Sequence, residues 1–133
     1  MNNKYNDLKK NLKNAYAPYS KFFVSAIVIP KENKNVFFNG VNIENSSFGA
    51  TICAERSAIC AMVSNGYKII SELHLLTSSV IDYVFPCGIC RQFISEFINE
   101  GTNIYIYNWE GNVLKKSFSD IMPNQIFKNK EIK

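Results

Sequence analysis

Apolar side chains recur at two spacings along this chain, and the spacings predict where helices and strands form. Within residues 3–15, Leu8, Leu12 and Ala15 share one face of a helical pattern, and Pro18 follows shortly afterwards. An apolar face that repeats every three or four residues is typical of an amphipathic helix, and proline ends one. The first predicted element is therefore a helix.

The middle of the chain alternates β-rich and helix-rich segments. Residues 22–29 and 36–41 are rich in β-branched and aromatic side chains, and the polar segment 31–35 between them predicts a hairpin. After a loop over residues 42–51, strong helix formers fill residues 53–64 and stop at an Asn-Gly pair, which is a good C-terminal signal. We expect two paired strands followed by a helix.

The second half of the chain continues this alternation. Residues 73–78 predict a strand, and residues 88–99, which follow a proline and are closed by a glycine, predict a helix. Residues 104–107 and 113–116 flank a Trp-Glu-Gly turn and predict a second hairpin, with a short helix after Ser119. The complete order predicts an α/β fold in which helices cover a five-stranded mixed sheet.

Length and composition limit the class of protein. A chain of 133 residues fits one domain, residues 1–133, and is too short for a catalytic domain with a separate nucleic-acid module. The hydrophobic fraction of 47% argues against disorder. Residues 1–20 lack the apolar core of a secretory signal, and the longest apolar run, residues 22–29, is too short to span a bilayer. We expect a cytoplasmic protein that binds no membrane.

The net charge of +4 does not indicate a nucleic-acid partner. Ten of the fifteen basic residues lie in residues 1–21 and 115–133, where they are expected to be solvated ends of the chain. Thirteen of the fifteen are lysine, and the two arginines, Arg56 and Arg91, each lie within three residues of a cysteine. Because only arginine offers a planar fork of donors, both positions need a local explanation.

Four cysteines supply the candidate chemistry. In a reducing compartment they are not expected to form disulfides, which favours metal binding wherever they lie at ligand spacing. Cys53 lies two residues before Glu55, and the run Pro-Cys-Gly-Ile-Cys places Cys87 and Cys90 three residues apart. Three thiolates suit zinc, and three protein ligands leave the fourth tetrahedral position open for a water, as in a catalytic site. Glu55 can move the protons of that water.

Helix geometry decides how these residues share one ion. Residues two apart inside a helix point in nearly opposite directions, so Cys53 and Glu55 must open a helix, with both side chains reaching beyond its first turn. Cys87 and Cys90 lie on one face at the start of the next predicted helix. Three thiolates leave a Zn²⁺ centre with one negative charge, and we hypothesise that Arg56 offsets this charge by donating to the sulfurs.

Other interpretations of the cysteines are weaker. A structural zinc site needs a fourth ligand, and Cys60 lies about 10 Å along a helix from Cys53, so we expect Cys60 to be a small buried apolar residue. His74 lies within a strand pattern, where a structural role is more common than metal binding. A thiol redox pair has no use for Cys53 or Glu55. The pattern therefore favours a catalytic zinc.

With these motifs the chain resembles the small homotetrameric cytidine deaminases over nearly its whole length. The runs Ala-Pro-Tyr-Ser-Lys-Phe at 17–22, Asn-Ile-Glu-Asn at 42–45 and Ser-Asn-Gly-Tyr at 64–67 also fall in family order. The resemblance implies a three-layer αβα sandwich, one zinc ion per subunit, and hydrolysis of cytidine or 2′-deoxycytidine to uridine or 2′-deoxyuridine and ammonia in pyrimidine salvage. It also implies that zinc-bound hydroxide attacks C4 while Glu55 transfers protons.

The same resemblance implies which residues bind the nucleoside. Phe22 packs near it, Asn42 and Glu44 hydrogen-bond the 3′-hydroxyl of the ribose, and Ala54 is a further substrate-binding residue. Outside the family motif, Asn and Glu in a loop are more often ordinary loop residues, and Phe at the start of a strand is more often a core residue. Within the motif we expect the binding roles.

In the resembled enzymes neighbouring subunits complete each active site, so a homotetramer is expected. The corresponding contacts fall on Ser46 and Phe48 and on the C-terminal aromatic Phe127. Phe48 stands where the family commonly has Tyr, and one additional residue near the C-terminus lets Ile126 compete for the place of the aromatic. Ser25 replaces a usual Gly in the first strand, which we expect to be tolerated unless backbones approach closely there.

Three rival functions have distinct signatures. A deaminase of a cytosine-containing antibiotic, of the blasticidin type, shares the zinc motifs, but Asn42 with Glu44 and Asn45 favours a ribose. Deaminases of RNA or DNA place a helix between the last two strands, and the turn at 109–111 leaves no room for one. A non-catalytic zinc protein has no use for Glu55 beside an open ligand position. We therefore expect a small nucleoside as the substrate.

Overall fold

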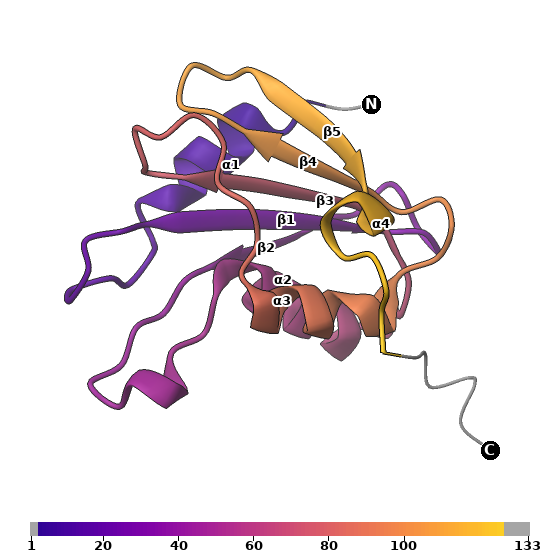
Figure 1. Ribbon diagram of the computed structural model, residues 1–133, viewed down its shortest axis with the longest axis horizontal. Coiled ribbons are helices and arrows are strands. Elements are labelled where there is room, and N and C mark those ends of the chain that lie inside the picture. Colours follow the sequence, from indigo (N-terminus) through magenta and orange to yellow (C-terminus); the bar gives the residue numbers. More distant parts are fainter. Residues whose placement is uncertain (1–2, 127–133) are drawn as a thin grey trace.

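The computed structural model describes residues 3–126, which form a five-stranded sheet between two layers of helices (Figure 1). The strands are β1 (Val24–Pro30), β2 (Phe38–Val41), β3 (Ile70–Thr77), β4 (Asn103–Tyr107) and β5 (Val113–Ser117). Their order in space is β2-β1-β3-β4-β5. Strands β3 and β4 are parallel, and the other neighbours are antiparallel, so the predicted mixed sheet is confirmed.

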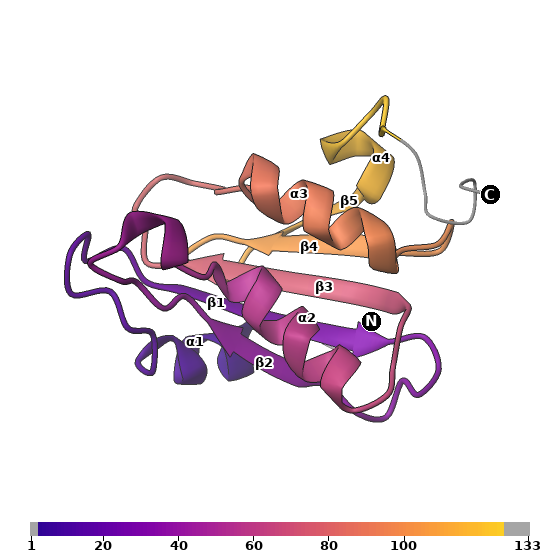
Figure 2. The ribbon, with the colours of Figure 1, turned by 90° about the horizontal axis from the view of Figure 1, so that it is seen from below.

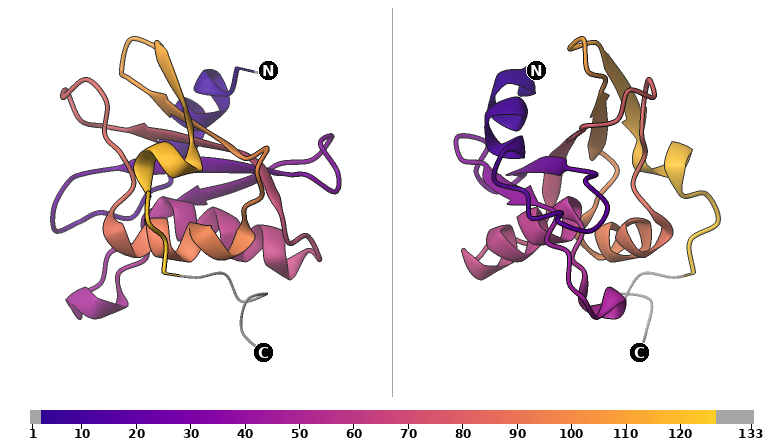
Figure 3. Two further views of the ribbon diagram at one scale, coloured as in Figure 1. Left: turned by 45° about the vertical axis from the view of Figure 1, so that its right-hand side comes forward. Right: turned by 90° about the vertical axis from the view of Figure 1, so that its left-hand side faces the viewer.

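Helices lie on both faces of the sheet. They are α1 (Tyr5–Leu12), α2 (Ala54–Ser64), α3 (Gly88–Ile94) and α4 (Phe118–Ile121), with two short 3-10 helices, η1 (Phe48–Ala50) and η2 (Ser95–Phe97). Helix α1 covers one face, whereas α2 and α3 lie side by side on the other (Figures 2 and 3). The predicted three-layer αβα sandwich is thereby confirmed. None of the helices in residues 3–126 combines the length and apolar character needed to cross a bilayer.

Alternation along the strands separates two cores. In β1, Ala26 and Val28 pack in the core beneath α2 and α3, whereas Ile27 and Ile29 pack in the core beneath α1. Every residue of β1 after Val24 is buried, because both faces of the strand are covered. Neighbouring residues of a central strand therefore lie in separate environments.

Helix α2 lies directly against β2 at Gly40. A Cβ atom at this position would be 2.3 Å from the backbone nitrogen of Ala58 and 2.4 Å from the carbonyl oxygen of Ala54. Both distances are far inside van der Waals contact, so only glycine allows this approach. The contact fixes the first two turns of α2 on the sheet.

Two predicted helices are shorter than expected. The helix predicted over residues 3–15 ends early because Asn14 and Ala15 donate to carbonyls three residues back instead of four. The third predicted helix divides into α3 and η2, and the Ser95 hydroxyl donates to the Gln92 carbonyl at 2.5 Å where the winding changes. Local hydrogen bonds of this kind compete with the α-helical ladder.

Strand β3 and helix α4 begin earlier than predicted. Strand β3 starts at Ile70, whose carbonyl accepts a 2.6 Å hydrogen bond from the Thr102 hydroxyl. Helix α4 starts at Phe118, because Ser117 and Asp120 form a capping box around its first turn. Strands β4 and β5 are joined directly by residues 108–112, as the second hairpin predicted.

Candidate metal centre and adjoining pocket

Helices α2 and α3 begin close together and bring three cysteines to one point. Cys53 is the N-cap residue of α2, Cys87 is the N-cap residue of α3, and Cys90 lies in the first turn of α3. The three sulfur atoms lie within 4.8 Å of one another, and those of Cys53 and Cys87 are 3.8 Å apart. Within residues 3–126 no other group of three metal-ligating side chains comes together in this way.

The sulfur spacing fits a tetrahedral zinc ion. A Zn–S bond is about 2.3 Å long, so two sulfur ligands of a tetrahedral ion are separated by about 3.8 Å. The Cys53 and Cys87 sulfurs have this separation. Three thiolates are also the soft donor set that zinc prefers. The residues present therefore fit the ion.

The two other candidate ligands lie elsewhere. Cys60 is exposed on α2, so the prediction that it is buried is wrong. The reason is that α2 packs on the sheet through the face that carries Ala58 and Met62 and turns Cys60 outward. His74 is fully buried on the side of β3 that faces α1, away from the sulfurs. Neither residue belongs to the cluster.

The surroundings of the Cys53 sulfur favour thiolate. Hydrogen bonding from the Cys90 thiol, and then from Arg56, lowers the pKa of Cys53 to about 5. The same sharing of a proton with Cys53 raises the pKa of Cys90. The Nη2 atom of Arg56 lies 3.4 Å from the Cys53 sulfur and 3.4 Å from the Thr51 carbonyl oxygen. A guanidinium group thus contacts the sulfur cluster directly.

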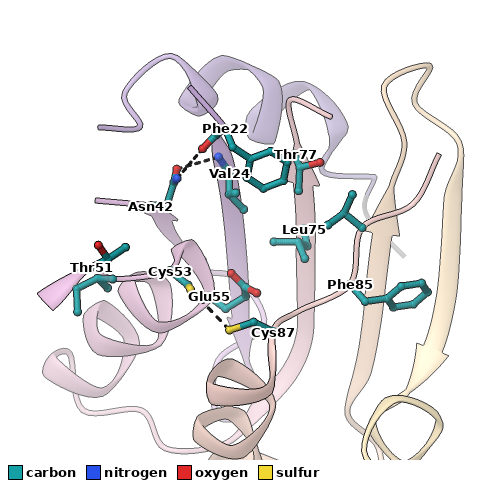
Figure 4. Close-up of a pocket in the computed structure, with 12 residues that line it drawn as sticks. Phe22, Val24, Asn42, Thr51, Cys53, Glu55, Leu75, Thr77, Phe85 and Cys87 are labelled. Atoms are coloured by element: carbon teal, nitrogen blue, oxygen red, sulfur yellow. Dashed lines mark hydrogen bonds between the residues drawn. The ribbon is translucent and has the colours of Figure 1, made fainter. Parts of the chain in front are cut away.

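Glu55 lies in the first turn of α2 beside these sulfurs. Its side chain is only 4% exposed and points into the space between Cys53 and Leu75 (Figure 4). Burial raises the pKa of Glu55 to about 7, and the nearby negative charge of Cys53 adds to this shift. A carboxyl group with such a pKa can both accept and release a proton near neutral pH.

A pocket of about 260 Å³ opens beside Glu55 and two of the sulfurs. Its walls come from β1, β3, the first turn of α2 and the segment before α3 (Figure 4). The lining residues are Phe22, Val24, Asn42, Thr51, Ile52, Cys53, Glu55, Leu75, Thr77, Val84, Phe85 and Cys87. An apolar lining that carries a few polar groups is typical of small-molecule sites.

The predicted substrate-binding residues lie in different settings. Phe22 and Asn42 line the pocket. The Asn42 amide accepts a hydrogen bond from the Val24 nitrogen and donates one to the Phe22 carbonyl, both at 2.8 Å (Figure 4). Glu44 and Ala54 do not line the pocket, and Ala54 is fully buried at the start of α2. The contacts of these four residues with a substrate stay predictions.

The residues predicted to reach a neighbouring subunit lie at the edge of the structure. Ser46 and Phe48 belong to the segment around η1, which projects away from the sheet at the lower left of Figure 1. The Phe48 side chain is 82% exposed. Phe127 lies outside the described residues, and Ile126, the last described residue, is exposed. Their intersubunit contacts stay predictions.

Sequence reasoning missed the apolar wall of the pocket. Leu75 and Thr77 alternate along β3 and so face the same side, a signal that the strand pattern already contained. Val84 and Phe85 lie in an irregular segment between β3 and α3, where no periodicity marks them. Their place in the wall depends on how the segment runs back to α3.

Comparisons with known proteins agree with this site. Residues 3–106 match the family model of the cytidine and deoxycytidylate deaminase zinc-binding region. The cytidine deaminase of Mycoplasma genitalium is 38% identical over 117 residues, 88% of either chain. That of Sporosarcina psychrophila is 36% identical over 120 residues, which are 90% of this chain and 86% of the relative. The chain is thus similar in sequence to curated cytidine deaminases over most of their length.

Solved structures show the same relation. The crystal structure of cytidine deaminase from Burkholderia pseudomallei superposes with a TM-score of 0.83 at 30% identity and covers 91% of this chain and 94% of that one. The fold and the three-cysteine centre therefore define a zinc-binding deaminase. More particularly, the chain belongs to the cytidine and deoxycytidylate deaminase family. The predicted zinc cofactor agrees with both the family and the sulfur cluster.

Proposed function

We propose that this protein catalyses the hydrolytic deamination of cytidine and 2′-deoxycytidine to uridine and 2′-deoxyuridine, with release of ammonia. The observation that carries this proposal is the position of Glu55, a buried carboxyl group beside three sulfurs at zinc-ligand spacing and at the wall of a pocket. A purely structural metal site has no use for such a group. The similarity to curated cytidine deaminases supports the choice of substrate.

The chemistry follows from the residues around the pocket. Cys53, Cys87 and Cys90 would hold the zinc ion. When bound, zinc lowers the pKa of a water toward neutrality and so supplies a nucleophile. Glu55 is placed to accept one proton from the attacking water and pass it to N3 of the pyrimidine, and then to take the second proton from the hydroxyl added at C4 and give it to the leaving amine. Arg56 stabilises the excess negative charge of the sulfurs through its contact with Cys53.

The sugar is expected to lie toward Asn42 and Glu44. After its two internal hydrogen bonds, the Asn42 amide keeps one N–H and one lone pair for a 3′-hydroxyl. Both ribose and 2′-deoxyribose carry this hydroxyl, so both nucleosides are proposed as substrates. Phe22, whose carbonyl accepts from the Asn42 amide, is proposed to pack on the nucleoside, with Ala54 contacting it from the start of α2.

We further propose that the protein is a homotetramer that acts in pyrimidine salvage in the cytoplasm, where its thiols stay reduced and able to bind zinc. Exposed apolar side chains on separate elements, Phe48 before α2 and Ile89 on α3, support burial between subunits. Ser46, Phe48 and Phe127 are the proposed contacts to a neighbouring active site. Light scattering should give four times the chain mass, and Phe48→Ser should lower both that mass and kcat/KM.

The test of the activity is the loss of the ultraviolet absorbance of cytidine, with ammonia measured in parallel for cytidine, 2′-deoxycytidine, cytosine and blasticidin. The Glu55→Gln variant should retain zinc but lose about 10²- to 10⁴-fold in kcat, because its amide cannot transfer the protons. Glu100→Gln, at an exposed site, is the matched control. If Glu55→Gln deaminates cytidine as fast as the parent, the proposed mechanism is wrong.

A further inference from the structure

The turn over residues 17–22, which joins α1 to β1, carries Phe22 to the pocket. It is a tight turn, since the Lys21 nitrogen donates to the Ala17 carbonyl at 3.1 Å. Lys21 has a φ of 59°, a left-handed conformation that a residue with a Cβ adopts at some cost. A turn of this kind persists only where neighbouring groups hold it in place.

Glu44 holds the turn through its carboxylate. One oxygen of Glu44 accepts from the backbone nitrogens of Tyr19, at 3.0 Å, and Ser20, at 3.1 Å. The other oxygen accepts from the Ser20 hydroxyl. That hydroxyl is the first cause of the lowered pKa of Glu44, which keeps the carboxylate ionised and able to accept. Glu44 is thus oriented by the turn that it holds.

Ser20 also holds Phe22. Its Oγ atom accepts a 3.0 Å hydrogen bond from the Phe22 nitrogen while its hydroxyl proton is given to Glu44. On the other side, the Asn42 amide donates to the Phe22 carbonyl. The backbone of Phe22 is therefore fixed at its N–H by Ser20 and at its C=O by Asn42. Ser20 is the one side chain that touches both Phe22 and Glu44 in these hydrogen bonds.

We propose that Ser20 is a positioning residue for the nucleoside, because its hydroxyl couples the orientation of the Glu44 carboxylate to the position of Phe22. This inference rests on the proposed function, in which Phe22 packs on the nucleoside and Glu44 binds its 3′-hydroxyl. Removal of the hydroxyl frees the Phe22 N–H and leaves one Glu44 oxygen without its donor. Both substrate contacts are then less well placed, although the residues that transfer protons are untouched.

The Ser20→Ala variant should therefore raise KM for cytidine about tenfold with little change in kcat, the result expected when binding common to ground state and transition state is lost. With 3′-deoxycytidine the rise in KM should be clearly smaller, because the contact with Glu44 is absent from the start. Ser20→Thr, which keeps a hydroxyl, should restore the parent KM. Zinc content and melting temperature accompany each measurement.

Ser79→Ala is the matched control. The Ser79 Oγ atom accepts a 3.0 Å hydrogen bond from the nitrogen two residues ahead, as Ser20 does, but no carboxylate accepts from its hydroxyl in the described residues. This variant should have the parent KM. An unchanged KM in Ser20→Ala, an equal rise with 3′-deoxycytidine, or no rescue by threonine would overturn the inference while leaving the proposed function intact. A parent protein that leaves cytidine unchanged would contradict the proposed function, and the inference with it.

Discussion

The two faces of β3 bury polar groups in opposite ways. On the face toward α1, the backbone nitrogen of Lys4 donates to the Tyr107 hydroxyl at 3.2 Å. That hydroxyl lies 2.8 Å from Nδ1 of His74. Nε2 of His74 lies 2.8 Å from Glu72, and the Tyr105 ring stacks on the imidazole at 4.6 Å between centroids. Neutral His74 with its proton on Nε2 satisfies every one of these contacts. In this network both ring nitrogens of His74 and the Tyr107 hydroxyl have partners within the protein.

On the other face, β3 contributes Leu75 and Thr77 to the pocket beside Glu55. Here the buried carboxyl group and the sulfurs of Cys53 and Cys87 face a cavity. Both faces therefore hold a buried titratable group with a shifted pKa, His74 toward α1 and Glu55 toward α2. Only Glu55 lies at a cavity. Burial of a titratable group is by itself weak evidence of function, and the adjoining cavity is what distinguishes the two.

We call the face of β3 toward the pocket the open face and the face toward α1 the closed face. Among the substitutions that compare the two faces, the largest effect is expected from Arg56, which contacts the Cys53 sulfur on the open face. Arg56→Gln should lower zinc affinity about 10- to 100-fold, because the excess negative charge of three thiolates loses its nearest cation. The measurement is zinc retention during titration with a chelator, together with the rate of deamination.

Arg91→Gln is the control for this prediction. It removes the same charge one residue from Cys90, but the guanidinium group of Arg91 donates to the carbonyls of Pro86 and Ile121 rather than to a sulfur. Its effect on zinc affinity should be smaller than that of Arg56→Gln. Parent-like zinc retention and rate in Arg56→Gln would refute the role of Arg56.

Substitutions in the His74 network on the closed face should lower the stability of the protein without affecting zinc binding. Tyr107→Phe keeps the ring but leaves Nδ1 of His74 without its donor, so it should cost about 2 kcal/mol in free energy of unfolding. Tyr5→Phe, which removes an exposed hydrogen bond to the Trp109 carbonyl, should cost less. Chemical denaturation measures both. Zinc loss in Tyr107→Phe would show that the two faces are not independent.

The sequence predicted the existence of the main elements from local signals. The five strands were predicted from β-rich runs, and the two helices that open with Cys53 and Cys87 from helix formers and end signals, and the structure contains all seven. The cysteine motifs could be assigned from spacing because a helix N-terminus is the one place where residues two apart converge. Local motifs of this kind can be recognised from a single sequence.

What the pattern missed depends on contacts between distant segments. Cys60 was expected in the core as a small apolar residue, yet the packing of Gly40 against α2 decides which face of the helix is covered. The early start of β3 follows from Thr102, thirty-two residues away. Val84 and Phe85 have no periodicity, so their place in the pocket wall needed the fold.

A smaller effect is expected in the pH dependence of stability, through His74 on the closed face. Burial lowers the pKa of His74, so between pH 6.5 and its folded-state pKa the unfolded chain binds a proton that the folded chain does not. Stability should therefore be full above about pH 6.5 and fall as pH drops below it, by at most about 1.4 kcal/mol per pH unit.

This measurement needs a background without Glu55. Because the pKa of Glu55 is raised to about 7, its contribution falls as pH rises through the same range and opposes that of His74. Cys53 must also be absent, because its pKa of about 5 makes its own contribution to stability fall with pH in the same direction as that of His74. His74 is the only histidine in the chain, so the free energy of unfolding of the double variant Glu55→Gln/Cys53→Ser between pH 7 and 5 reports on it. A stability that rises as pH falls below 6.5 in that variant would contradict the prediction.

The smallest predicted effect concerns the one exception on the closed face. Ser25, paired with Leu76 across the sheet, is fully buried, and its hydroxyl has no hydrogen-bond partner among residues 3–126. Ser25→Ala should raise the free energy of unfolding by about 1 kcal/mol, because a buried hydroxyl without a partner is costly. A loss of stability, measured by denaturation, would show that this hydroxyl has a partner in solution.

The central claim is that Cys53, Cys87 and Cys90 hold one zinc ion beside Glu55, and metal analysis of purified protein tests it most directly. Cys60, exposed on α2 outside the cluster, provides the matched control. The parent and Cys60→Ser should each contain one zinc per chain, whereas Cys53→Ser, Cys87→Ser and Cys90→Ser should each lose it. Parent-like zinc content in any of these three variants, or a parent that binds no zinc, would contradict the claim.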